Sequence, residues 1–197
     1  MEQYNYEYEQ DSIYCYPDSF ILKNKLNISE QIVLEDAERN ITALRILELK
    51  QNPPAGKMNF KYLKKLHSQI FGDIYDWAGK VRIVNITKGN MFCDCRFIEQ
   101  MADGIFKELE NEHYLQLYDV ETAAGRLAYY LSEINALHPF REGNGRTQRL
   151  FIEILAERAG FEVDFSEVSA EEMIEASAES FLKRYEKMDR LIRRIIT

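Results

Sequence analysis

The segment His138–Arg149 constrains the fold of this chain more than any other, because it places a proline and two glycines between two strong helical patterns. Pro139 disfavours helical geometry at the residue before it, so the first of these helices is expected to end at His138. Gly143 and Gly145 allow a tight turn before the second helix begins. The pattern predicts two helices joined by a sharp turn, with the ring of His138 able to point into a cleft.

Helix caps and chain breaks predict a mostly α-helical fold around this turn. Asn27 and Glu30 match an N-cap and its third-position partner, which predicts a first helix reaching about Lys50. Its apolar stripe is expected to face the core and consists of Ile32, Val33, Ala37, Leu44 and Leu47. Caps and glycine stops predict further helices at about 59–72, 94–112, 119–137, 145–159, from 169 onward, and at 182–195.

One segment predicts a β-hairpin. Val81–Thr87 mixes β-branched residues with an arginine and an asparagine, Lys88-Gly89-Asn90 is a turn signal, and Met91–Asp94 can form the returning strand. Near the start of the chain, Tyr4, Tyr6, Tyr8, Tyr14 and Tyr16 are evenly spaced. We interpret the Tyr-rich residues 1–26 as an extended segment that lays alternate rings on the domain, with a recognition arm as the alternative.

Composition excludes several classes of protein. The 197 residues include 33 acidic and 25 basic side chains, a net charge of −8, which argues against a general nucleic-acid coat because such proteins need a basic face. The N-terminus lacks a secretory signal, and no apolar run is long enough to span a bilayer. Cys15, Cys93 and Cys95 have no zinc-like spacing, so we interpret them as reduced thiols of a cytoplasmic protein.

The turn and the helix after it have the chemistry of a phosphate site. A glycine-flanked turn that leads into a helix offers unpaired backbone N–H groups and the positive end of the helix dipole, so Gly143-Asn144-Gly145 predicts an anion site. With helical geometry from Glu142 onward, Glu142, Arg146 and Arg149 fall within about 60° of one another at about 100° per residue.

These side-chain types suit a magnesium–nucleotide complex. Arginine forks match phosphate oxygens, and a single carboxylate is typical of a Mg²⁺ ion that takes its other ligands from water and phosphates. His138 is placed to act as a base. The residues therefore predict transfer of a phosphate-containing group to a hydroxyl. An ordinary helix-turn-helix with a Glu142–Arg146 ion pair is the alternative.

His138–Arg149 matches, without departure, the signature of Fic domains (filamentation induced by cAMP), His-Pro-Phe-x-(Asp/Glu)-Gly-Asn-Gly-Arg-x-x-Arg. Residues 67–82 resemble the segment before the Fic flap, and 16–28 resemble the start of stand-alone bacterial Fic toxins. The resemblance covers roughly 14–195. It implies one Fic domain over 1–197, a mostly α-helical bundle with one small β-hairpin, and 138–149 as its signature loop and helix start.

The resemblance also implies a reaction, which is transfer of AMP from ATP to a serine, threonine or tyrosine of a target protein. His138 would take the proton from the target hydroxyl, and Glu142 would hold the Mg²⁺ that bridges the α- and β-phosphates. Pro139 and Phe140 would be structural, with Phe140 packing in the core and holding the loop.

The remaining signature residues would bind the nucleotide phosphates. The backbone of Gly143, Asn144 and Gly145 would form the anion hole, with the Asn144 side chain helping at the α-phosphate. Arg146 and Arg149 would grip the triphosphate tail.

The predicted hairpin would be the Fic flap, which pairs with an extended segment of the target protein by β-augmentation. Its residues are expected to be Val84, Asn85, Ile86, Thr87, Lys88, Gly89, Asn90 and Met91.

Many Fic proteins carry an inhibitory helix with the pattern Ser/Thr-x-x-x-Glu-Gly/Asn, whose glutamate pairs with the second signature arginine, here Arg149. No serine or threonine in this chain is followed four residues later by glutamate. The resemblance therefore implies a toxin whose inhibitory helix is supplied by a separate small antitoxin. It also implies, as targets, the ATPase subunits of DNA gyrase and topoisomerase IV.

Two alternatives stay open. Some Fic relatives transfer UMP, phosphocholine or phosphate, and the sequence does not assign the residues that select the donor. A nucleotide-binding interaction module without catalysis is the second alternative, although the presence of His138 weighs against it. Of the other histidines, His67 is interpreted as structural, because it shares a helical face with Leu63, Leu66 and Ile70.

Overall fold

The computed structural model describes residues 11–88 and 90–197. Its longer elements are helices, and the one named sheet in the described residues has two very short strands. The mostly α-helical prediction is therefore confirmed. The elements are α1 (Gln31–Gln51), α2 (Phe60–Phe71), β1 (Thr87–Lys88), β2 (Asn90–Met91), α3 (Ile98–Asn111), α4 (Val120–Leu137), α5 (Asn144–Ala159), α6 (Ala170–Phe181) and α7 (Glu186–Ile195).

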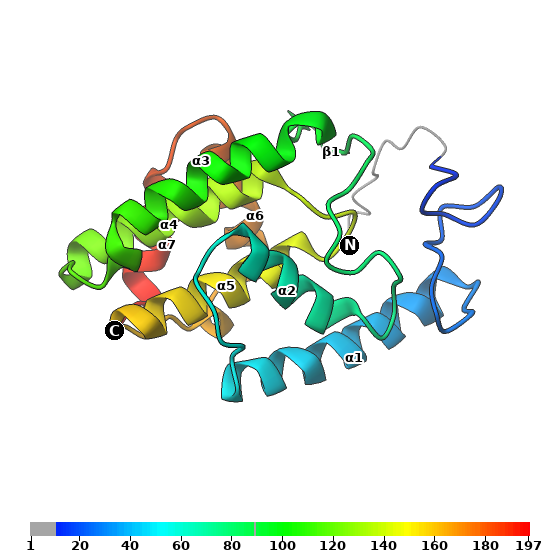
Figure 1. The fold of residues 1–197 in the computed structure, drawn as a ribbon, viewed down its shortest axis with the longest axis horizontal. Coiled ribbons are helices and arrows are strands. Elements are labelled where there is room, and N and C mark those ends of the chain that lie inside the picture. The colour runs from blue at the N-terminus through cyan, green and yellow to red at the C-terminus, as the bar shows by residue number, and fades with distance from the viewer. Residues whose placement is uncertain (1–10, 89) are drawn as a thin grey trace.

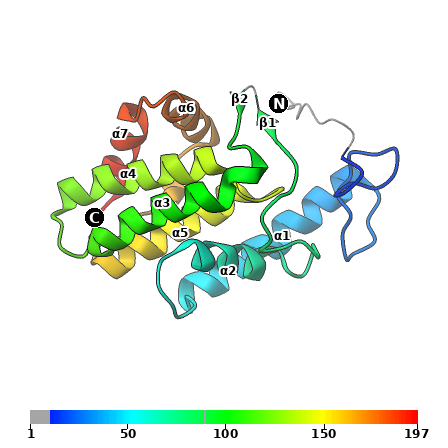
Figure 2. The same ribbon diagram turned by 45° about the horizontal axis from the view of Figure 1, so that its top comes forward.

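The helices form layers around α5. In Figure 1, α5 runs between α3 and α4 on one side and α1 and α2 on the other. Helix α4 packs against α3, α5, α6 and α7, and α2 packs against both α1 and α5. Figure 2 shows β1 and β2 side by side, apart from the helical layers. The turn between α4 and α5 thus lies among α2, α4, α5 and the segment that leads to the two strands.

The core follows from the apolar faces of the central helices. On α4, Leu127, Tyr130, Leu131 and Ile134 are all buried, as the helical spacing predicts. On α2, the buried face includes Leu63, Leu66 and Ile70. Local caps are also confirmed: the side chains of Asn59, Asp119 and Ser169 accept backbone N–H groups at the starts of α2, α4 and α6.

The prediction for the first helix is wrong in two respects. Helix α1 begins at Gln31 and its N-cap, Glu30, makes no side-chain cap bond. Asn27 lies in a turn with φ 56° instead of capping the helix. The predicted apolar stripe faces outward, with Ile32 75% and Leu44 58% exposed, because α1 buries Leu34, Thr42 and Leu49.

The hairpin prediction holds for its position but not for its length. Thr87 pairs with Met91 and Lys88 with Asn90 in an antiparallel register. The other described residues of 81–94 form no strand. The last helix is also shorter than predicted and begins at Glu186, after Lys183 adopts a φ of 62° that interrupts helical geometry.

The described part of the N-terminal segment packs on the loops beside the helices. The ring of Tyr14 meets Trp77 edge to face at 5.8 Å, and Tyr14 is buried. Asp11 forms a buried ion pair with Arg141 at 2.8 Å. Tyr4, Tyr6 and Tyr8 lie outside the described residues. Within 11–88 and 90–197, no helix combines the length and the apolar character that crossing a membrane requires.

Replacing Asn59 with alanine tests the capping of α2. The Asn59 side chain accepts the Tyr62 N–H at 3.0 Å, and alanine would leave that donor unpaired. We expect Asn59→Ala to lower the free energy of unfolding by about 1 kcal/mol, or about 2–4 °C in Tm. Asn59→Asp keeps an acceptor and serves as the control in the same thermal melts. Equal losses for both variants would contradict the capping role.

Candidate functional site

The turn after α4 holds His138 in an unusual backbone conformation. His138 has φ 45° and ψ 60°, a left-handed geometry that few non-glycine residues adopt. Its N–H donates to the Ile134 carbonyl at 3.1 Å, and its own carbonyl accepts from Arg82 Nε at 2.8 Å. The ring is 8% exposed and stacks on Phe92 with a centroid distance of 3.8 Å. The imidazole is therefore fixed at the rim of the turn.

Asn144 closes the turn from inside. Its Oδ1 accepts the Phe140 N–H at 2.9 Å, and its Nδ2 donates to the Phe140 carbonyl at 2.8 Å. The side chain is 3% exposed. Both of its polar atoms are thus engaged within the loop. The Asn144 amide therefore holds the loop in shape. Its role at the α-phosphate stays a prediction.

The two glycines of the turn have different structural causes. Gly143 has φ 76°, and a Cβ there would lie 2.1 Å from the Phe71 ring, so packing within the chain requires glycine. At Gly145 the nearest atom that an added Cβ would meet is the tip of the Arg149 guanidinium, at 3.3 Å. Packing alone therefore does not require glycine at 145, and the backbone there is open to a close approach.

The start of α5 is where an anion would bind. Helix α5 begins at Asn144 with Gly143 as its N-cap, so the first N–H groups have no partner within the helix. A carboxylate already lies beside this end, since Glu142 Oε1 accepts the Gly143 N–H at 2.8 Å. Arg146 approaches the same carboxylate at 4.0 Å. Glu142, the glycine turn and the first turn of α5 are thus brought together, as predicted.

Arg146 has partners that the sequence did not reveal. Its guanidinium forms an ion pair with Glu38 of α1 at 2.5 Å and donates to Thr42 Oγ1 at 3.0 Å. It also lies over the Phe71 ring, 4.8 Å from the centroid. The hydroxyl of Tyr75 donates to Glu38, and burial, followed by the charge of Glu38, raises the pKa of Tyr75. The inhibitory pattern places serine or threonine four residues before glutamate. Here the order is reversed, because Glu38 comes four residues before Thr42, so this pair does not match the pattern.

Arg149 differs from Arg146 in having no ion pair with the residues in 11–88 and 90–197. It is half-buried, and burial together with the nearby charge of Arg146 lowers its pKa from the ordinary arginine value. An arginine retains its charge despite such a shift. The site therefore contains one guanidinium that forms an ion pair with Glu38 and a second, that of Arg149, that forms no ion pair with a described residue, although the charge of Glu153 acts on it.

His67 links the two loops of the site, which confirms its structural interpretation. It is fully buried and stacks on Phe140 at 3.8 Å between ring centroids and on Phe71 at 4.7 Å. Its Nδ1 accepts the Gly79 N–H at 2.8 Å, so Nε2 carries the proton and donates to the Glu142 carbonyl at 3.0 Å. Burial lowers the pKa of His67 to about 3. The ring is a neutral connector.

The predicted flap residues project from this site. Ile86 is buried, whereas Met91 is 60% exposed and Asn85 Oδ1 accepts the Cys95 N–H at 2.8 Å. Val84 contributes its carbonyl to Arg82 at 2.7 Å. The backbone of Lys88 and Asn90 lies in β1 and β2, opposite each other, and Thr87 faces Met91. Gly89 lies outside the described residues.

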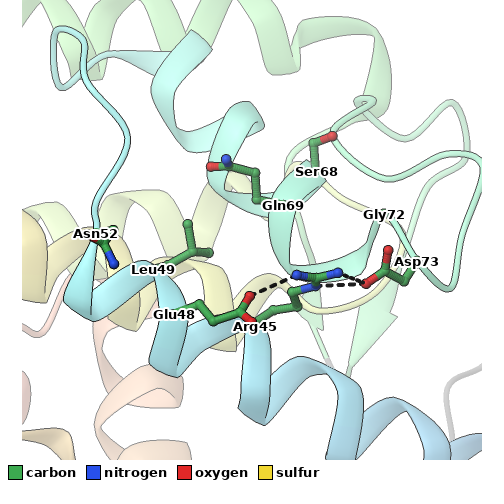
Figure 3. Close-up of a pocket in the computed structure, with 8 residues that line it drawn as sticks. All are labelled: Arg45, Glu48, Leu49, Asn52, Ser68, Gln69, Gly72 and Asp73. Carbon is green, nitrogen blue, oxygen red and sulfur yellow. Dashed lines mark hydrogen bonds and ion pairs between the residues drawn. The ribbon is translucent and has the colours of Figure 1, made fainter.

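A pocket of about 520 Å³ lies elsewhere, between the second half of α1 and the end of α2 (Figure 3). Arg45 lies in it with its guanidinium paired to Glu48 at 2.8 Å and to Asp73 at 2.7 Å. None of the residues predicted for the site lines it. Because its one arginine is already neutralised by two carboxylates, this pocket is a poor receptor for phosphate.

The donor set at Glu142 fits one kind of metal. No group of three or more His, Cys, Asp or Glu side chains that could hold an ion occurs in the described residues, so a closed protein cage is absent from them. A single carboxylate beside an anion-binding helix end suits Mg²⁺, which keeps waters and takes phosphate oxygens.

Comparison with known proteins agrees with this geometry. A family model described as the Fic/DOC family matches residues 57–156. The chain is 42% identical to "Protein adenylyltransferase VbhT" of Bartonella schoenbuchensis, over 93% of this chain and 39% of that protein. It is 38% identical to "Probable protein adenylyltransferase y4lH" of Sinorhizobium fredii, over 92% and 94% of the two chains. This chain therefore spans well under half of VbhT and nearly all of y4lH.

Solved structures give the same result. The N-terminal Fic domain of a VirB-translocated effector from Bartonella quintana, solved with bound ADP, superposes with a TM-score of 0.89 at 30% identity and covers 93% of this chain and 94% of that one. BepC of Bartonella tribocorum, solved with bound AMPPNP, has a TM-score of 0.88 at 26% identity, with coverage of 93% and 96%.

The neutral state of His67 predicts a pH dependence of stability. The pKa of His67 is about 3 in the folded chain and 6.5 in the unfolded chain. Below pH 6.5 the unfolded chain therefore binds a proton that the folded chain does not. We expect the free energy of unfolding to fall by about 1.4 kcal/mol per pH unit as the pH drops from 6.5 toward 3. The full contribution is present above pH 6.5.

Chemical denaturation of the wild type and of His67→Gln at pH 7.5 and 5.0 measures this effect. The variant should show a shallower pH dependence than the wild type. His113→Gln, which removes an exposed imidazole, is the matched control and should keep the wild-type slope. An unchanged slope in His67→Gln would contradict the assignment.

Proposed function

The chain belongs to the Fic/DOC family, and from this premise we propose that it is a protein adenylyltransferase that moves AMP from ATP to a hydroxyl side chain of a target protein. The observation that carries the proposal is the position of His138. Its ring is fixed by the stack on Phe92, and its residue begins the turn that leads through Glu142 and Gly143 into α5. A base next to an anion site is what transfer to a hydroxyl requires.

His138 acts as the general base of the reaction. Its ring removes the proton from the target hydroxyl, whose oxygen forms a bond to the α-phosphorus of ATP. The bond from that phosphorus to the bridging oxygen of the β-phosphate breaks, and pyrophosphate leaves. The products are a phosphodiester-linked AMP on the target and pyrophosphate, with the proton on His138.

The phosphates bind at the start of α5. The N–H groups after Gly143 and the open backbone at Gly145 receive phosphate oxygens, where the helix dipole favours negative charge. The guanidinium of Arg149 binds the triphosphate tail, and its lack of a described ion pair supports that role. Arg146, which is held by its ion pair with Glu38, adds positive charge to the phosphate site.

Magnesium completes the nucleotide complex, with Glu142 as the residue that holds it. When bound, the ion neutralises charge on the phosphates. Glu142 is anchored for this task through its backbone, because its carbonyl accepts from the neutral ring of His67.

The flap from Val84 to Met91 docks the target. Its two paired strands are short, and an extended segment of a target protein can add to an exposed strand edge. Such docking brings the target hydroxyl toward His138, because Phe92 follows the flap directly and stacks on the imidazole.

The proposal includes a partner and a target class. We propose that a separate antitoxin supplies the inhibitory glutamate to Arg149, and that the targets are ATPase subunits of DNA gyrase and topoisomerase IV in the cytoplasm. Two features support the first point. No Ser/Thr-x-x-x-Glu pattern occurs in the sequence, and among the described residues the carboxylate that pairs closely with a signature arginine, Glu38, contacts Arg146. The target class rests on the resemblance to stand-alone Fic toxins.

The general-base role of His138 predicts a separation of binding from transfer. His138→Ala should abolish AMP transfer while the dissociation constant for Mg-ATP stays within about threefold, because the phosphate ligands remain. Transfer of label from α-³²P-ATP and calorimetric titration measure the two effects. Transfer that survives in His138→Ala would refute the mechanism, and an equal loss of binding would leave the role of His138 structural.

The target is tested in a bacterial lysate that receives the chain, Mg²⁺ and α-³²P-ATP. We expect a labelled band of the size of a topoisomerase ATPase subunit that gains the mass of one AMP and is absent with His138→Ala. Label from UTP or from another donor in place of ATP would favour the alternative transferases. Nucleotide binding without any transfer would favour the interaction module.

A further inference from the structure

Arg82 is a buried cation that the proposed reaction does not use. Its side chain is 1% exposed, and burial lowers its pKa from the ordinary arginine value. Backbone carbonyls surround its charge: Nε donates to His138 at 2.8 Å, Nη1 to Val84 at 2.7 Å and Nη2 to Cys93 at 2.5 Å. A buried guanidinium is tolerated only where such bonds replace water, so these three contacts determine its position.

The three carbonyls belong to three parts of the site. Val84 begins the flap segment, Cys93 follows its second strand, and His138 lies in the signature turn. Backbone bonds reinforce the same junction, because the Arg82 N–H donates to the Pro139 carbonyl at 2.9 Å and the Cys93 N–H to Ala136 at 3.1 Å. One side chain thus joins both ends of the flap to the residue proposed as the base.

Phe92 extends this junction to the imidazole itself. Its ring is nearly parallel to that of His138, at 13°, and meets Phe181 edge to face at 5.8 Å. Its N–H donates to the Ile86 carbonyl across the flap at 3.2 Å. Phe92 directly precedes Cys93, so the bond from Arg82 to Cys93 sets where the Phe92 ring lies against His138.

We propose that Arg82 is a positioning residue that holds the His138 ring and the flap as one unit. The inference rests on the proposed function for the roles of base and flap. The contacts of Arg82 from which it is argued do not depend on that function. Lysine cannot replace arginine here, because a single ammonium on a flexible stem does not span three separated carbonyls as a planar guanidinium does. Loss of Arg82 therefore displaces the base and the docking strand together.

The structural test compares Arg82→Lys and Arg82→Gln with Arg158→Gln. Arg158 is a matched control, because it also bridges backbone carbonyls, those of Gly56 at 2.7 Å and Pro54 at 2.9 Å, far from His138 in sequence and contacts. The chain has three histidines, so spectra of the ¹³C-histidine-labelled protein can be assigned with His138→Ala.

We expect both Arg82 variants to shift the His138 ring signals, through loss of the Phe92 stack, and to speed amide exchange at Cys93 by about 10-fold or more. Arg158→Gln should lower Tm without either change. Unchanged His138 signals and Cys93 exchange in folded Arg82 variants would overturn the proposal, as would full rescue by Arg82→Lys.

Activity gives an independent measure. The acceptor is the target protein that the lysate experiment labels with AMP. Arg82→Lys should reduce turnover with this acceptor by about 10- to 100-fold and raise its KM. The Kd for Mg-ATP should stay within about twofold of the wild-type value. Arg158→Gln should keep wild-type turnover at temperatures below its Tm. If the wild-type chain transfers no AMP, the proposed function fails, whereas the spectra and exchange rates still decide the role of Arg82.

Discussion

The turn between α4 and α5 must hold two residues in the left-handed backbone region, and only one of them is glycine. For His138 this conformation costs roughly 1–2 kcal/mol, which the surrounding contacts must offset. The bonds to Ile134 and Arg82 and the stack on Phe92 supply that compensation. Helix α4, the segment before the flap and the residue after it therefore meet at one histidine, and the positions of these elements depend on that turn.

Electrostatics divide the site into a neutralised side and a receptive side. Helix α1 brings Glu38 to Arg146, and the neutral His67 ring adds no charge beneath the turn. Arg149 forms no ion pair with a described residue, although the charge of Glu153 acts on it, and Glu142 accepts the Gly143 N–H at the N-terminus of α5. In the proposed function, this distribution of charge would favour the phosphates at the start of α5 and Arg149 over the side that faces α1.

Local signals in the sequence predicted most elements, and long-range contacts explain the failures. The caps at Asn59, Asp119 and Ser169 involve residues three positions away, so sequence alone reveals them. The outward face of α1 was misassigned because apolar residues occur on more than one side of that helix. Long-range packing on α2 and α5, including the contact between Glu38 and Arg146, 108 positions apart, selects the buried side. Pairing in the flap is short for a similar reason, since the carbonyls of Val84 and Cys93, at its two ends, accept from Arg82 instead of from backbone N–H groups of the opposite strand.

The signature combines residues with two separate tasks, and the structure distinguishes them. Phe140, Gly143 and Asn144 are fully engaged inside the chain, through the His67 stack, the contact with Phe71 and the paired amide bonds. Gly145 and Arg149 make few such contacts, so packing within the described residues gives no reason for their identity. The inner set is sufficient to shape the turn before any nucleotide binds, because its hydrogen bonds and ring contacts are all formed within the chain. In the proposed function, the outer set contacts the nucleotide phosphates. A chain that retained the inner residues alone would then keep the turn and lose part of the proposed nucleotide site, so the outer residues, more than the fold, argue for nucleotide binding.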